Sequence, residues 1–167
     1  MANTQSMCTS FMGELLIGAH QFGAVTLISR TSLTTPTTDT FKAALYFASA
    51  TINAGTTVYT TTGEVTGTGY TAGGATVTNA NAPAYATSST TAGVAYWTAS
   101  ASIVYSTVTI ATAFDSVLIY NSTQTVGGAG RAVSVHTFGS QTITAGTFTL
   151  TMPSNTTSSA LLRLATT

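Results

Sequence analysis

The sequence predicts an all-β protein: an antiparallel β-sandwich or jelly-roll-like domain that follows a short amphipathic helical arm. Three observations favour this fold. Threonine, which is β-branched and suits a pleated surface, is the commonest residue and makes up nearly a quarter of the chain. Beyond residue 40, short apolar runs alternate with turn signals at a spacing of roughly ten residues. The crossover helices that a parallel sheet needs have no counterpart in the pattern after residue 23.

The β-domain is expected to span residues 39–167. Turn signals at residues 53–55, 127–130 and 144–146 separate the expected strands. These strands cover residues 41–48, 56–60, 75–79, 94–99, 103–110, 117–120, 132–138, 148–152 and 161–165. Residues 24–38 are expected to form a linker or loop insertion between this domain and the segment before it.

Residues 1–23 are expected to form an N-terminal helical arm. Within residues 5–22, apolar side chains recur at three- and four-residue spacing, which places them on one stripe of a helix. Ser6 can cap its start and Gly23 can end it. A helix this short is not stable alone in water, so the stripe must pack on this chain's own β-domain or on another subunit. The candidate interface residues are Cys8, Phe11, Met12, Leu15, Leu16 and Phe22.

Charge is scarce in this chain. Only 5% of the residues are charged, and four acidic and four basic residues give a net charge of zero. Scattered bases do not form the basic stripe of a nucleic-acid binder. Membrane spanning is also not expected, because no apolar run approaches the roughly 18 residues that it needs. Polar residues after Met1 argue against a signal peptide, so we expect assembly in a cytoplasm. A neutral, charge-poor surface suits a chain that neighbouring subunits cover.

Side chains capable of chemistry are few, and we expect no catalytic residue, no cofactor and no metal. Glu64 and Asp115, the acids well inside the β-domain, are expected to be solvated. His20, expected in the last turn of the helix, and His136, expected at an exposed or interfacial strand position, supply too few ligands for zinc even with Cys8. Cys8 lies on the apolar stripe, where cysteine usually behaves as a small buried hydrophobe.

The stretch 63–74 is the densest in glycine. It fits neither the dinucleotide-binding nor the Walker spacing, so we expect a wide structural loop or bulged hairpin. Glu64 is expected to hold this loop by accepting backbone hydrogen bonds. The candidate structural residues are Gly63, Glu64, Gly67, Gly69, Tyr70, Gly73 and Gly74.

Tyrosine is the other conspicuous residue type. Seven tyrosines and one tryptophan exceed what a small core needs. Because a tyrosine can pack at one end and bond a polar partner at the other, we favour protein–protein contacts for some of them. A carbohydrate-binding platform is the alternative.

Four segments carry motifs of a known family. They are CTSFMGELLIGAHQF at residues 8–22, FKAALY at 41–46, TVYTTTGEVTGTGYTAGGA at 57–75 and VLIYN at 117–121. Together they resemble a family of small structural proteins encoded among the virion genes of tailed bacteriophages. The Glu-Leu-Leu-x-Gly-x-His arm and the Glu-Val-x-Gly-x-Gly-Tyr loop are the most specific parts of the resemblance. Residues 24–38 look like an insertion, and residues 80–110 are richer in Ala, Ser and Thr than the family pattern.

The resemblance implies a component of the virion without catalytic chemistry. A compact β-domain with an apolar arm fits a capsid decoration, or cement, protein. Such a protein forms homo-oligomers, commonly trimers, and binds the major capsid protein to stabilise the head. Another virion protein is the alternative partner; nucleic acid and membrane are not expected as partners. The alternative functions are a tail- or fibre-associated structural protein and a host-surface carbohydrate-binding adhesin. We expect the chain to be located in the virion, assembled in the host cytoplasm.

Overall fold

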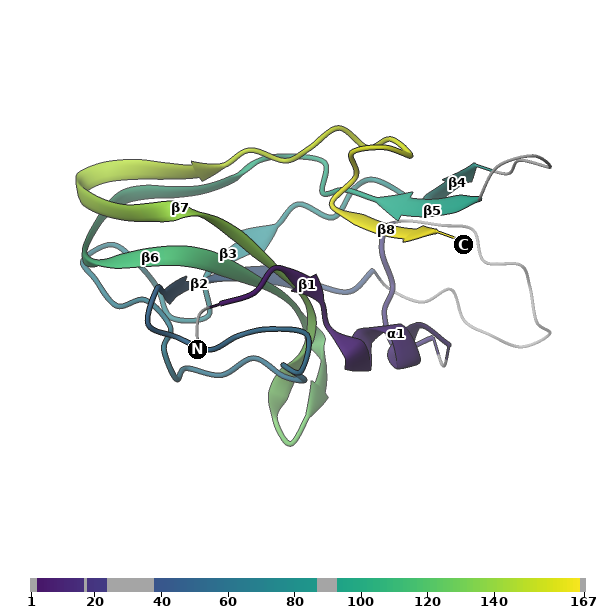
Figure 1. Ribbon diagram of the computed structural model, residues 1–167, viewed down its shortest axis with the longest axis horizontal. Helices are drawn as coiled ribbons and strands as arrows, with labels where there is room; N and C mark the ends of the chain where they lie inside the picture. The colour runs from purple at the N-terminus through teal and green to yellow at the C-terminus, as the bar shows by residue number, and fades with distance from the viewer. Residues whose placement is uncertain (1–2, 17, 24–37, 87–92, 166–167) are drawn as a thin grey trace.

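The computed structural model describes residues 3–16, 18–23, 38–86 and 93–165 (Figure 1). These residues form antiparallel strands and one short helix, which confirms the predicted all-β fold with a short N-terminal helix. The expected linker of residues 24–38 lies, apart from Thr38, outside the described residues.

Two antiparallel sheets make up the described part of the chain. One is five-stranded, in the order β1-β7-β6-β2-β3, and the other is three-stranded, in the order β4-β5-β8. The larger sheet contains β1 (Ser6–Met7), β2 (Phe41–Phe47), β3 (Ala75–Val77), β6 (Ile103–Val126) and β7 (Ala129–Leu150). The smaller sheet contains β4 (Ala84–Ala86), β5 (Val94–Trp97) and β8 (Leu162–Ala165), and the helix is α1 (Thr9–Leu16). The small sheet lies at the right of Figure 1, above α1.

The β6–β7 hairpin replaces four of the short strands that the sequence predicted. Residues 103–110 and 117–120 both belong to β6, and residues 132–138 and 148–150 both belong to β7. The segments between them are bulges rather than turns, so each pair of expected strands is one continuous strand. Repeated register shifts interrupt the pairing between Tyr105 and Ser116. Bulges bend a strand pair. The hairpin therefore curves back at the left of Figure 1, and its two halves form facing layers.

Aromatic rings fill the space between these two layers. The ring of Phe114 meets those of Phe138 and Phe148 edge-on, with centroids 5.8 and 5.1 Å apart respectively. The hydroxyl of Tyr105 crosses to β2 and donates to the carbonyl oxygen of Ala43 at 2.6 Å. These contacts join residues from both halves of the hairpin, so the bend creates the core.

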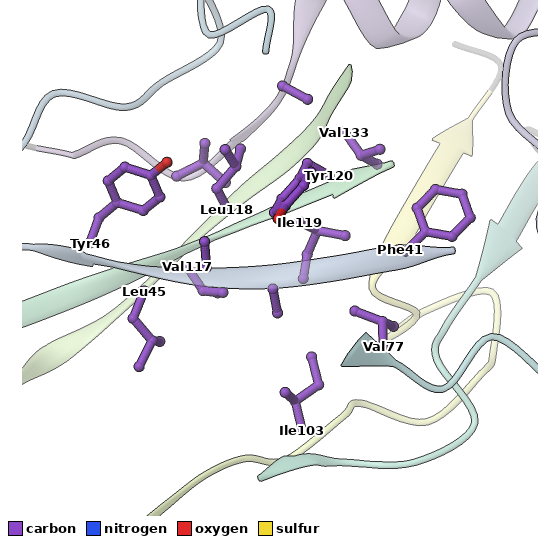
Figure 2. Close-up of a cluster of buried hydrophobic side chains, with 14 of the residues drawn as sticks. Phe41, Leu45, Tyr46, Val77, Ile103, Val117, Leu118, Ile119, Tyr120 and Val133 are labelled. Atoms are coloured by element: carbon purple, nitrogen blue, oxygen red, sulfur yellow. The ribbon is translucent and has the colours of Figure 1, made fainter. Parts of the chain in front are cut away.

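Strand β2 lies between β6 and β3 in the larger sheet and is buried on both faces. Figure 2 shows Leu45 and Ile103 on one side of β2, with Tyr46 and Leu118 on the other. Leu45 and Tyr46 are both fully buried although they are neighbours in the strand. The side chains of this strand therefore do not divide into a core face and a solvent face.

The remaining sequence predictions for strands met mixed outcomes. Residues 56–60 do not form a strand, and only an isolated bridge joins Val58 to Arg131. Strands β1 and β4 were not predicted. Both are short, and a strand of two or three residues has too few positions to show a period of two.

The helix is shorter than the predicted span of residues 5–22. Ser6, the expected cap, instead lies in β1 and pairs with Val135 of β7. The helix ends at Leu16, and Gly18 follows with a φ of 70°. The Gly18 amide donates to the Leu15 carbonyl and the Ala19 amide to the Glu14 carbonyl. These two hydrogen bonds form the Schellman motif, in which a residue just after the helix has a positive φ and is therefore usually glycine. Gly18, not Gly23, therefore terminates the helix.

Gly74 is predicted to be among the least replaceable glycines. It has a φ of 72°, and a Cβ there would overlap the carbonyl oxygen of Ala43 in β2. Gly128, in the β6–β7 turn, has a φ of 84°, but no atom lies within 4 Å of the position that a Cβ would take there. Gly128→Ala should therefore cost only the left-handed backbone strain of about 1–2 kcal/mol. Gly74→Ala should cost about 2 kcal/mol more, measured by denaturant unfolding. Equal losses would contradict the close approach of Gly74 to β2.

Candidate functional site

A buried polar cluster attaches the arm to the β-domain. Glu14 of α1 accepts hydrogen bonds from His20 Nε2, at 2.6 Å, and from Arg131 of β7, at 2.5 Å. Asn121 of β6 donates from its amide nitrogen to His20 Nδ1, at 3.0 Å, and to Asp39, at 2.7 Å. The cluster therefore links the arm, the start of the β-domain and the two longest strands.

The hydrogen bonds of this cluster define the state of His20. Because Nδ1 accepts from Asn121, Nε2 carries the proton that is donated to Glu14, and the ring is neutral. Burial lowers the pKa of His20, although Glu14 opposes the shift. The prediction that His20 sits in the last helical turn was wrong, since the helix ends four residues earlier and His20 instead packs into the core. Its role in this arrangement is to hold the arm against the sheet.

A second buried cluster surrounds Glu64. Its carboxylate accepts from the Gly73 amide at 2.7 Å and from the hydroxyls of Tyr59 and Tyr70 at 2.5 and 2.8 Å. Burial, with a contribution from the Glu64 carboxylate, raises the pKa of both hydroxyls, so both remain protonated donors. The expectation of a solvated Glu64 was wrong, because the side chain is buried. The expected backbone hydrogen bond to the loop is present once, from Gly73.

The glycine-rich loop lies along the edge of β6. The Thr109 amide donates to the Thr68 carbonyl at 2.9 Å. A Cβ at Gly67 or Gly69 would overlap carbonyl oxygens of this strand, so the loop needs glycine there for close approach rather than for binding a phosphate. Tyr70 joins the loop to β2, since its hydroxyl also accepts from the Leu45 amide at 3.0 Å.

The structure divides the candidate interface residues of the arm into two groups. Cys8, Phe11 and Phe22 pack inside the chain's own core, so placing them at an interface with another subunit was wrong. Burial raises the pKa of the Cys8 thiol to about 12, which keeps it protonated. Met12 and Leu16 lie on the opposite side of α1 and are exposed, with Leu16 at 89%. Leu15 is partly buried against the core.

An apolar groove of about 240 Å³ lies between the arm and the small sheet. The arm supplies one wall, and β5, β8 and Pro83 supply the other. None of its lining residues is Asp, Glu, Lys or Arg. They are Met7, Phe11, Leu15, His20, Gln21, Phe22, Pro83, Ala95, Tyr96, Trp97, Leu162 and Leu164. This groove and the exposed face of α1 are the candidate interaction surface.

A second cleft, of about 350 Å³, opens between the two layers of the hairpin. His136 of β7 lines it, and the imidazole Nε2 lies 2.9 Å from the hydroxyl oxygen of Ser134. Burial lowers the pKa of His136 to about 4, so the ring is neutral near pH 7. His136 is thus partly buried rather than exposed. Asp115 is also not free in solvent, because it accepts from the side-chain amide of Asn3 at 2.7 Å.

Sequence reasoning missed the partners of these clusters. Asp39, Asn121 and Arg131 were not predicted as site residues, although Asn121 ends one of the four family-like segments. Nothing in the spacing of Glu14, His20 and Asn121 indicates that they meet, because more than a hundred positions separate the first from the last.

Comparisons with known proteins found no matching family model, no matching curated protein and no matching solved structure. In the described part of the chain, His, Cys, Asp and Glu side chains do not gather in groups of three that could hold a metal ion. Among the described residues, no helix has both the length and the apolar character that crossing a membrane requires.

Removing the Glu64 carboxylate should destabilise the fold. Glu64→Ala leaves one buried donor, the Gly73 amide, and two partly buried tyrosine hydroxyls without their acceptor. We therefore expect a loss of about 3 kcal/mol or more in the free energy of unfolding. Glu64→Gln should lie between this variant and wild type, because its carbonyl oxygen still accepts. Thr66→Ala, at an exposed position of the same loop, is the control and should change stability by less than about 0.5 kcal/mol. Unfolding in urea measures all three.

Acid should weaken the fold through His136. Its pKa in the folded state, about 4, lies below the value of 6.5 for an unperturbed histidine. The neutral ring therefore contributes its full stabilisation above pH 6.5 and loses it as the pH falls towards 4. Between pH 7 and pH 4.5, His136→Gln should lose about 2 kcal/mol less stability than wild type. Parallel losses in the two proteins, measured by urea unfolding at both pH values, would contradict a neutral buried ring.

Proposed function

We propose that this chain is a non-enzymatic structural protein of a tailed-phage particle, and most specifically a capsid decoration protein. It would form homo-oligomers and bind the major capsid protein to stabilise the head. The proposal rests on the resemblance of its motifs to phage virion proteins and on the use that the fold makes of those motifs.

One observation carries the proposal. Four polar residues of the motifs, Glu14, His20, Glu64 and Asn121, are buried and hydrogen-bonded within the fold. Glu14, His20 and Asn121 join the arm to the two longest strands. Glu64 instead closes the glycine-rich loop on itself. The motifs thus specify a rigid scaffold with a clamped arm, which is the property that a structural subunit needs.

The surface supports the same function. Three of the four acidic residues are buried, and Arg131 pairs with one of them. This leaves little surface charge to oppose association. The apolar groove and the exposed face of α1 give such a chain a place to meet a neighbouring subunit.

The location of the chain in the particle tests this function. We expect image reconstruction of the phage particle to find it on the outer surface of the head, with a copy number that is a multiple of the oligomer. Purified protein should bind empty capsids and not purified tails. Binding to tails alone would replace capsid decoration with the tail-associated role. Binding to host-cell polysaccharide, without binding to any part of the particle, would replace it with the adhesin role.

A further inference from the structure

Exposed apolar side chains concentrate around the groove. In the described residues, six large apolar side chains are exposed: Met12, Leu16, Tyr85, Val104, Val126 and Leu164. The first two come from α1, while Tyr85 and Leu164 come from the small sheet that forms the other side of the groove. Four of the six thus belong to the two elements that flank one groove. Such a concentration marks an interaction surface, whereas single exposed apolar residues do not.

The arm carries both an apolar projection and part of an apolar recess. Met12 and Leu16 are four positions apart, so they lie one turn from each other on the same outer face of α1. Phe11 and Leu15, on the other side of the helix, line the groove. Met12 is 46% exposed and Leu164, at the far wall of the groove, is 42% exposed. The chain therefore presents an apolar side-chain pair and an apolar recess next to each other.

We propose that the groove between α1 and the β4–β5–β8 sheet receives Met12 and Leu16 of a second copy of this chain. This inference deepens the proposed function, on whose homo-oligomer it rests, by naming the surfaces that join two subunits. A projection and a matching recess on one molecule allow reciprocal insertion about a two-fold axis or a closed ring.

The chemistry of the two surfaces favours a second copy as the occupant. The groove offers no charged residue to pair with a charged partner. The one acid of α1, Glu14, faces inward and pairs with His20 and Arg131, so the outer face of the helix brings no charge to the contact. A neutral apolar helix face entering a neutral apolar groove leaves no charge buried without a partner.

Complementary charge variants test the proposal in the full-length protein. Leu16→Lys spoils the projection but leaves the groove intact, and Leu164→Glu spoils the groove but leaves the projection intact. Each variant alone should self-associate at least about tenfold more weakly than wild type in analytical ultracentrifugation. An equimolar mixture should regain association, because the intact projection of one variant fits the intact groove of the other.

Val126→Lys is the matched control. Val126 is 48% exposed, close to Met12 and Leu164 in this respect, but lies at the β6–β7 turn. This variant should self-associate like wild type. Unchanged association of Leu16→Lys, or a mixture that stays monomeric, would overturn the proposal. A monomeric wild type would also overturn it, since no second copy would then enter the groove.

Two further measurements separate this inference from the proposed function. Should Leu164→Glu fail to fold by circular dichroism, Met12→Lys and Leu16→Lys, both on the exposed helix face, decide the question by their loss of association. Capsid binding is measured for every variant. If Leu16→Lys self-associates like wild type and still binds capsids, only the proposed interface is refuted. If the variants self-associate more weakly as expected but wild type does not bind capsids, only capsid decoration is refuted.

Discussion

The bend in the β6–β7 hairpin is the constraint on which the rest of the structure depends. Two strands of this length, 24 and 22 residues, would form a long twisted ribbon if their register were regular. The register shifts between Tyr105 and Ser116, with left-handed backbone at Thr107 and Ala145, bend the ribbon instead. Its two halves then face each other and enclose the phenylalanine cluster. The loop at residues 63–74 lies against the edge of β6, and β2 pairs with β6 beyond the bend.

Burial of the few charges follows from this architecture. Glu14, Asp39 and Glu64 lie inside the molecule, where an unpaired carboxylate is costly, so each is surrounded by donors. Because Glu14 and Asp39 have donors far along the chain, these two carboxylates join parts of the chain that hydrophobic packing alone would fix less specifically. The same arrangement removes charge from the surface. Because most of its acidic side chains are buried, the chain has a charge-poor surface that suits contact with other subunits.

The arm has two faces with different roles. Its inner face, with Phe11 and the Glu14–His20 pair, completes the core, and β1 extends the larger sheet. Deleting the arm would therefore damage the domain as well as any interface, which makes single exposed positions such as Leu16 the informative ones. The outer face remains available beside the apolar groove. In the proposed decoration protein, the same segment would thus stabilise the subunit and join it to its neighbour.

The sequence by itself determined the fold class, the position of the helical arm and the structural nature of the glycine-rich loop. These depend on local signals: threonine content, apolar periodicity, glycine density and the absence of helical pattern after residue 23. The sequence did not reveal that residues 103–126 form one strand, because a bulge and a turn both appear as a run of small and polar residues. It also did not show which side of α1 faces inward. Phe11 and Leu16 both belong to one apolar stripe, and only packing of α1 against β7 decided that Phe11 is buried and Leu16 is exposed. The partners of Glu14 and Glu64 were likewise settled by tertiary structure, since a buried carboxylate selects whichever donors the folded chain brings within reach.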